Sequence, residues 1–242
     1  MDETEKSNDP ASIRPYLNQD DETRERWLAY DKDIDLVSTQ IGAMPAVVDL
    51  IGISGKIGSG KTEAARTIRR IYEGAGFRCE EKTLATMLKA GVAAMTGGDP
   101  YTHDGKDKYV ASWDRTVGQI MQELGTWCRD HFRTDVWVDS LLDNFASASE
   151  SARDKPVVWV ISDVRFPNEA DAIKAKGGVL IRLWGDPAGT AKNSTRDHSH
   201  ISECALDTYA GFDYTIDNDK HDKGLFSVKV AKIIQEMNEC GK

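Results

Sequence analysis

Residues 46–62 read Ala-Val-Val-Asp-Leu-Ile-Gly-Ile-Ser-Gly-Lys-Ile-Gly-Ser-Gly-Lys-Thr, and this stretch decides the fold. Its first half is short, mostly apolar and β-branched, which favours a buried strand of a parallel sheet. From Lys61 a helical pattern of apolar residues follows until Gly74-Ala-Gly76 ends it. Residues 55–62 match G-x-x-x-x-G-K-[ST] between the predicted strand and helix, which is the context that a phosphate-binding P-loop requires.

The residues of this turn suit a nucleoside triphosphate. Its glycines let the backbone turn its N–H groups inward, where phosphate oxygens meet donors and the positive end of a helix dipole. Lys61 supplies a charge for the β- and γ-phosphates, and Thr62 offers its hydroxyl to Mg²⁺. The alternative is a glycine-rich turn with an incidental lysine. The residues predicted to hold the nucleotide are Gly55, Lys56, Ile57, Gly58, Ser59, Gly60, Lys61 and Thr62.

A second apolar strand is predicted at Val157–Ile161, and it ends at Ser162-Asp163. A carboxylate at this point would face the cation of the P-loop, so Asp163 is predicted to hold Mg²⁺ through water; a helix cap or turn aspartate is the alternative. Val164 and Arg165 follow, so no adjacent glutamate is present to activate water, and the chain has no N-K-x-D segment for guanine. Transfer of a phosphoryl group to a bound acceptor is therefore favoured over hydrolysis.

Strands and helices are predicted to alternate along the rest of the chain. This alternation indicates an α/β fold, with a parallel sheet covered on both faces. Residues 1–35 hold eleven acidic and five basic residues, so residues 1–45 are predicted to form an acidic extension with a short helix near 22–30, and residues 46–242 the main domain. Further strands are predicted near 77–84, 179–184 and 212–216, and further helices near 85–95, 113–146, 168–176, 201–208 and 225–237.

The charge and hydropathy of the chain exclude several classes of protein. Its 242 residues carry a formal charge of −9, which argues against a surface that binds nucleic acid, although a confined basic groove stays open. Apolar runs such as residues 157–161 are far shorter than the roughly 20 residues of a membrane helix. The N-terminus lacks the basic and apolar segments of a secretory signal, so a cytoplasmic location is expected. The four cysteines lie far apart and are expected to be reduced thiols.

Several segments of the chain resemble the bacteriophage-type deoxynucleoside monophosphate kinases, a branch of the P-loop nucleoside monophosphate kinase superfamily. The resemblance covers residues 47 to about 235. It implies a three-layer P-loop kinase fold with a central parallel sheet, a helical acceptor-binding insert at about 85–150 and a small lid at about 185–200. The segments are the P-loop, residues 115–126 with Arg129 and 135–138, residues 161–170 (Ile-Ser-Asp-Val-Arg-Phe-Pro-Asn-Glu-Ala), residues 198–203 and, more weakly, residues 214–218.

The resemblance also implies the roles of particular residues. ATP is the expected donor, with Mg²⁺, and Asn218 is expected beside its adenine. Phosphoryl transfer between two polyanions needs positive charge where they meet, and guanidinium groups bind phosphate bidentately. For each arginine, a solvated or structural ion pair is the alternative. The acceptor is assigned to Lys89, Arg115, Gln122, Arg129 and Arg165, and catalysis to Lys61, Asp163, Arg165 and the lid residue Arg196.

The reaction expected from the resemblance is transfer of the γ-phosphoryl group of ATP to a deoxynucleoside 5′-monophosphate, which gives ADP and a diphosphate. Two alternatives stay open. One is a P-loop kinase acting on a hydroxyl of a modified base in DNA, for which Asp163 would be the base. The other is a P-loop ATPase or regulatory module. The expected partners are small nucleotides, with a homodimer left open, and the expected location is the host cytoplasm if a phage encodes the chain.

Overall fold

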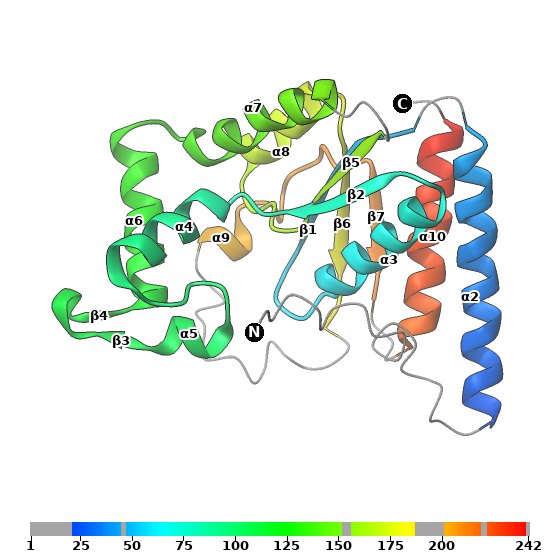
Figure 1. Ribbon diagram of the computed structural model, residues 1–242, viewed down its shortest axis with the longest axis horizontal. Coiled ribbons are helices and arrows are strands. Elements are labelled where there is room, and N and C mark those ends of the chain that lie inside the picture. Colours follow the sequence, from blue (N-terminus) through cyan, green and yellow to red (C-terminus); the bar gives the residue numbers. More distant parts are fainter. Residues whose placement is uncertain (1–20, 45–46, 152–155, 187–200, 219–221, 241–242) are drawn as a thin grey trace.

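A five-stranded sheet forms the centre of the molecule (Figure 1). The computed structural model describes residues 21–44, 47–151, 156–186, 201–218 and 222–240. The strand order is β2-β5-β1-β6-β7, and all neighbouring strands are parallel, which confirms the α/β class. The strands are β1 (Leu50–Gly55), β2 (Arg78–Lys82), β5 (Val157–Ile161), β6 (Val179–Trp184) and β7 (Tyr214–Asp217).

Helices cover both faces of this sheet. Ile51 and Ile53 of β1 pack into the core beneath α3 and α10, whereas Leu50 belongs to the core beneath α7 and α8. Because both faces are buried, the three central strands β1, β5 and β6 read as mostly apolar runs instead of alternating ones. The covering helices are α3 (Lys61–Gly74) and α10 (Lys223–Glu239) on one face, and α7 (Val136–Ser151) and α8 (Pro167–Ala175) on the other.

The segment between β2 and α7 forms an insert beside the sheet. Leu88, Val92, Val117 and Ile120 give it a small core of its own. The sequence predicted one helical region at 113–146, but the structure has a short hairpin, then α6, then a break before α7, whose residues Leu141 and Phe145 pack on the core of the sheet. The elements are α4 (Thr86–Thr96), α5 (His103–Asp107), β3 (Tyr109–Val110), η2 (Ala111–Trp113), β4 (Arg115–Thr116) and α6 (Val117–His131).

Helix α2 (Asp21–Gly42) lies against α3 and α10, at the end of the sheet away from the insert (Figure 1). Ile34, Val37 and Ile41 are buried in the same core as the sheet, because their spacing places them on one face of the helix. Arg70 of α3 pairs with Asp31 and with Asp35 of α2. The expected boundary near residue 45 is therefore corrected: residues 21–42 belong to the domain, and residues 1–20 lie outside the described residues.

The strand order creates a crevice at the carboxyl end of β1. From β1 the chain first runs to β2 and β5 on one side and later to β6 and β7 on the other. Ligands of open α/β sheets bind at such a switch point. Residues 187–200 of the predicted lid, with Arg196, lie outside the described residues, and α9 (Ile201–Cys204) follows them. Among the described helices, none has the length and hydropathy needed to cross a bilayer.

Candidate active site

The P-loop lies between β1 and α3, as the sequence predicted. Gly58 and Gly60 adopt φ angles of 81° and 95°, a left-handed backbone that residues with a side chain rarely adopt. The turn brings Lys61, the first residue of α3, back over the loop. Its Nζ donates to the carbonyl oxygens of Gly55 at 2.5 Å and Lys56 at 2.7 Å. The ammonium group is thus held at the mouth of the glycine-rich turn.

The charge of Lys61 is sensitive to its surroundings. Burial, with a smaller contribution from the nearby Arg165 guanidinium, lowers the pKa of this lysine to about 8, whereas Glu203 and Asp163 act in the opposite direction. At neutral pH the ammonium form still dominates. A phosphate anion beside this group would favour the charged form, so the P-loop is suited to an anionic ligand.

Residues from three other segments support the P-loop. The side-chain amide of Asn218, after β7, donates to the Ser59 carbonyl oxygen at 3.1 Å. Arg182 of β6 is buried and donates to Ser54 Oγ and to Asp207, each at 2.8 Å, and Asp207 also pairs with Lys56 at 2.7 Å. The structure therefore places Asn218 against the backbone of the loop, while its predicted place beside adenine stays a prediction. The sequence analysis missed Arg182, although a charged residue inside an apolar strand indicates a buried polar contact.

The loop's donor groups fit a triphosphate with Mg²⁺. The Ser59 hydroxyl is buried and has no hydrogen-bond partner in the part of the chain that the structure describes. Thr62 is exposed in the first turn of α3, at the positive end of the helix. Within the described ranges, no group of three or more histidine, cysteine or acidic residues could hold a metal ion by itself. A Mg²⁺ ion at this site would be bound partly by protein oxygens and partly by oxygens of the bound phosphates.

A cavity of about 740 Å³ lies between the insert and the carboxyl edge of the sheet. It is lined by α4, α5, α6, α9 and the loop after β5. The structure brings together on its wall most of the side chains predicted for the acceptor, and adds Lys106, which the sequence analysis missed. The predicted residues that line it are Lys89, Gln122, Arg129, Asp163 and Arg165.

Arg115 does not line this cavity. The β3–β4 hairpin carries it to the far end of the insert (Figure 1), where its side chain is 44% exposed and donates to Glu123 at 2.9 Å. For Arg115 the structure therefore has the alternative arrangement, an ion pair on the surface. The assignment to the acceptor followed from the resemblance of residues 115–126; in the structure Arg115 directly precedes the capping box of Thr116 and Gln119 that starts α6.

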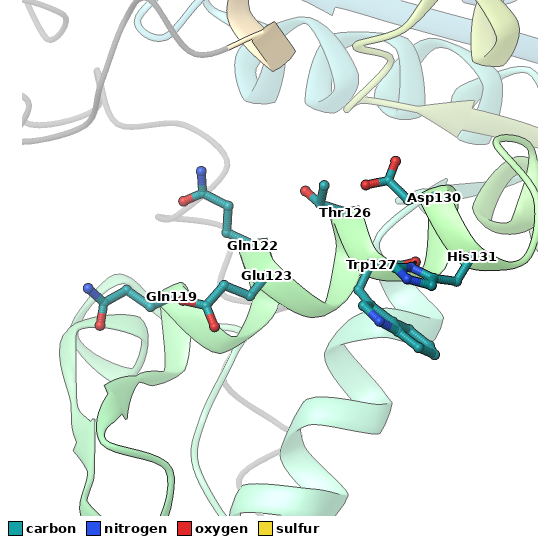
Figure 2. Close-up of a pocket in the computed structure, with 7 residues that line it drawn as sticks. All are labelled: Gln119, Gln122, Glu123, Thr126, Trp127, Asp130 and His131. Carbon is teal, nitrogen blue, oxygen red and sulfur yellow. Dashed lines mark hydrogen bonds between the residues drawn. The ribbon is translucent and has the colours of Figure 1, made fainter.

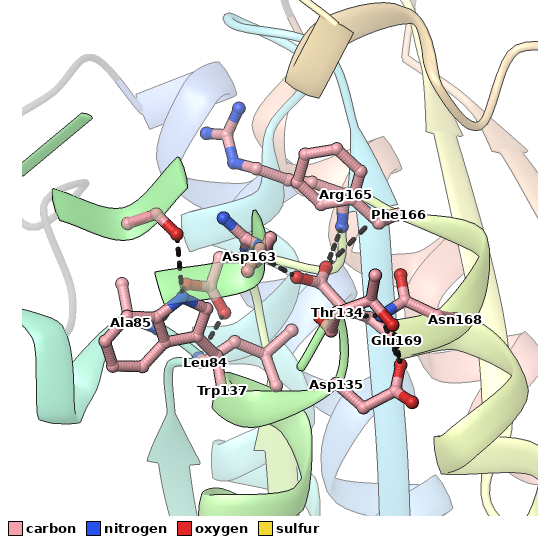
Figure 3. A network of polar contacts seen from close by, with 12 residues as sticks. Leu84, Ala85, Thr134, Asp135, Trp137, Asp163, Arg165, Phe166, Asn168 and Glu169 are labelled. Carbon is pink, nitrogen blue, oxygen red and sulfur yellow. Dashed lines mark hydrogen bonds and ion pairs between the residues drawn. The ribbon is translucent and has the colours of Figure 1, made fainter. Parts of the chain in front are cut away.

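Asp163 ties the end of β5 to the insert. Its two carboxylate oxygens accept the backbone N–H groups of Leu84 at 2.8 Å and Ala85 at 3.4 Å, just before α4 (Figure 3). Burial raises the pKa of this carboxyl group, although the two N–H donors and Lys89 act against the shift. The turn-capping alternative therefore describes its observed contacts. Each oxygen retains a lone pair, so its role toward Mg²⁺ stays a prediction.

The two arginines of the cavity wall are each paired with a carboxylate. Arg129 of α6 donates to Glu169 Oε1 at 3.0 Å and lies over the ring of Phe166, with 4.6 Å from Cζ to the ring centroid. Arg165 pairs with Glu203 of α9. The two carboxylate side chains are only 3% and 7% exposed, but the arginines are 27% and 33% exposed and can reach the cavity. The sequence analysis gave neither glutamate a role in the site.

Gln122 lies on the face of α6 that looks toward the sheet. Figure 2 shows Gln122, Thr126 and Asp130 projecting from this face, with Trp127 and His131 beside them. The Trp127 and His131 rings stack at 4.5 Å, and Trp127 is 46% exposed. This second hollow, of about 570 Å³, is lined by α6 alone and shares four residues with the larger cavity.

A P-loop at the switch point of a parallel sheet, beside a cavity with cationic side chains, defines a P-loop protein that can bind a nucleoside triphosphate next to a second anion. The family model described as "Deoxynucleotide monophosphate kinase" matches residues 101–228. Over 200 residues the chain is 30% identical to a protein of Acanthamoeba polyphaga mimivirus named "Putative deoxynucleotide monophosphate kinase", with 74% of this chain and 92% of that protein covered. The chain belongs to the deoxynucleotide monophosphate kinase family.

Two solved structures are more distant. One is a sugar kinase from Janibacter sp. HTCC2649, with 18% identity, a TM-score of 0.39 and coverage of 78% of this chain and 95% of that one. The other is a gluconokinase from Sinorhizobium meliloti 1021, with 17% identity, a TM-score of 0.39 and coverage of 79% and 94%. Family membership makes this chain a nucleotide kinase, a phosphotransferase that acts on small nucleotides.

Proposed function

We propose that the protein transfers the γ-phosphoryl group of ATP to deoxynucleoside 5′-monophosphates and so forms ADP and deoxynucleoside diphosphates. The observation that supports this most is the position of Arg165. Its charge acts on Lys61 of the P-loop, and its side chain lines the cavity together with Arg129 and Lys89. One guanidinium group therefore lies between the donor loop and the proposed acceptor cavity.

The proposed reaction does not need a general base, because the acceptor oxygen already belongs to a phosphate anion. Catalysis then depends on alignment and on neutralising the charge that spreads over the transferring group. Lys61 binds the donor phosphates, Arg129 orients the acceptor phosphate, and Arg165 contacts both. When bound, Mg²⁺ would be held by Thr62 and, through water, by Asp163, and would neutralise charge on the donor phosphates.

The pairing of Arg165 with Glu203 is compatible with this role. A guanidinium group has five N–H donors in a planar fork, so it can keep one carboxylate partner while other N–H groups meet phosphate oxygens. The carboxylate also keeps a partly buried cation stable before substrates arrive. We assign Arg165 to the transfer step more than to ATP binding.

An ADP-release assay tests the proposal. Purified protein receives ATP, Mg²⁺ and one of several acceptors: each deoxynucleoside monophosphate, each ribonucleoside monophosphate, or DNA. We expect ADP release that depends on at least one deoxynucleoside monophosphate and is lost in the Lys61→Ala variant. ADP release that is the same with and without every monophosphate would contradict the proposal and favour an ATPase. Release that depends on DNA and weakens steeply with salt would favour the kinase of modified bases.

A further inference from the structure

The loop after β5 and the start of α8 together contact three parts of the insert (Figure 3). Asp163 receives the backbone N–H groups that precede α4. The side-chain amide of Asn168 donates to the Thr134 carbonyl oxygen at 3.1 Å and to Asp135 Oδ1 at 2.7 Å, in the turn between α6 and α7. Glu169 receives Arg129 of α6. Residues 163–169 thus attach the insert that forms the cavity to the edge of the sheet at three points.

Glu169 has a complete set of partners. One oxygen, Oε2, accepts the backbone N–H groups of Arg165 at 2.8 Å and Phe166 at 3.1 Å. The other, Oε1, accepts the N–H of Arg129 at 3.0 Å, and the carboxylate side chain is only 3% exposed. A buried carboxylate is stable when it is both hydrogen-bonded and paired with a charge. One side chain therefore fixes the guanidinium of Arg129 and the backbone of Arg165.

We infer that Glu169 is a positioning residue of the phosphoryl-transfer site, which acts through Arg129 to orient the acceptor phosphate. The inference rests on the proposed function, because it takes the cavity to be the acceptor site. A cap for α8 needs only the one oxygen that receives the two backbone N–H groups. The second oxygen is used for a residue 40 positions away in the sequence. That long-range contact is the part that capping does not explain.

The substitution Glu169→Gln separates the two roles. Its amide oxygen can still accept the backbone N–H groups of Arg165 and Phe166, so the cap of α8 is retained. Its NH₂ group then faces the guanidinium of Arg129, and two donors cannot bond to each other. The variant is expected to fold and to release Arg129 from its orientation.

Steady-state kinetics give the first readout. For Glu169→Gln the KM for the deoxynucleoside monophosphate should rise about tenfold, the effect of losing a charge-assisted hydrogen bond, while the KM for ATP changes less than about twofold. In an Arg129→Ala background the same substitution should cause no further rise, because the two residues act as one unit. The matched control is Glu73→Gln, which breaks an exposed pair with Arg69 on α3 and should leave both KM values unchanged.

Equal rises in both KM values, or effects of Glu169 and Arg129 that multiply, would overturn the inference and leave Glu169 a purely structural residue. Amide hydrogen exchange supplies a second readout that does not depend on activity. Glu169→Gln should speed exchange in residues 125–137, and not in α3 or α10. If the wild-type protein phosphorylated no monophosphate, the proposed function would fall, and unchanged exchange in residues 125–137 would separately overturn the link between Glu169 and Arg129.

Discussion

Replacing Lys61 should abolish activity and at the same time relieve a cost in stability that depends on pH. The pKa of this lysine is lowered from 10.5 to about 8, mainly by burial. Each pKa unit corresponds to about 1.4 kcal/mol, so the charged side chain costs the folded state about 3 kcal/mol relative to the unfolded chain. In the variant Lys61→Met, this cost is absent and most of the aliphatic stem is kept.

The direction of this pH dependence follows from the number of protons that the folded and unfolded states bind. Below pH 8 both states of the wild type hold the proton, and the full cost is present. Between pH 8 and 10.5 the folded protein releases the proton before the unfolded chain does, so the unfolding free energy contributed by Lys61 rises with pH. Lost hydrogen bonds to Gly55 and Lys56 offset part of the variant's gain at neutral pH, by about 1–2 kcal/mol, but do not change the slope.

Urea unfolding at several pH values from 7 to 10.5 measures this effect. The difference in unfolding free energy between Lys61→Met and the wild type should fall by about 3 kcal/mol across the series, and other titrating groups cancel in the difference. Lys176→Met, at an exposed position after α8, is the control and should show a constant difference. If the difference in unfolding free energy for Lys61→Met were also constant, burial would not lower the pKa of this lysine, and the reasoning would be refuted.

Four further substitutions test the site. Arg129→Ala should raise the KM for the monophosphate at least about tenfold. Arg115→Ala should leave this KM unchanged, because Arg115 lies outside the cavity. Similar effects of the two variants would contradict the placement of the β3–β4 hairpin. Arg165→Lys should lower kcat about a hundredfold with an unchanged Kd for ATP, since its planar fork is lost; a weaker Kd with normal kcat would argue against its transfer role. Gly60→Ala should raise the KM for ATP and lower the unfolding free energy by about 1–2 kcal/mol. The φ angle of Gly60 is 95°, and an added Cβ would lie 2.5 Å from Asn218 Nδ2. Urea unfolding that matches the wild type would contradict this expectation.

Local patterns in the sequence were sufficient for the part of the fold that binds the donor. The apolar runs of β5 and β6 and the helix from Lys61 to Gly74 were predicted with nearly the observed bounds, because each is decided by neighbouring residues. The P-loop was predicted from its glycines and its place between strand and helix. Both features need no knowledge of the rest of the chain.

Contacts between distant segments could not be predicted in this way. The pair of Arg129 and Glu169 spans 40 residues, and Asp163 bonds to backbone groups nearly 80 residues earlier. The break between α6 and α7 contains neither glycine nor proline, so the strongest local signals that end a helix were absent. The acceptor side of the site depends on these contacts, which is why Glu169 and Glu203 were given no role in the site.

Following the γ-phosphate of ATP tests the central claim most directly. Protein with Mg²⁺, ATP labelled in the γ-phosphate and a deoxynucleoside monophosphate is sampled over time, and the products are separated. If the P-loop and the cavity together form a phosphoryl-transfer site, the label appears in the deoxynucleoside diphosphate, with one ADP formed for each. Label that appears only as inorganic phosphate, at a rate that the monophosphate does not change, would contradict this account.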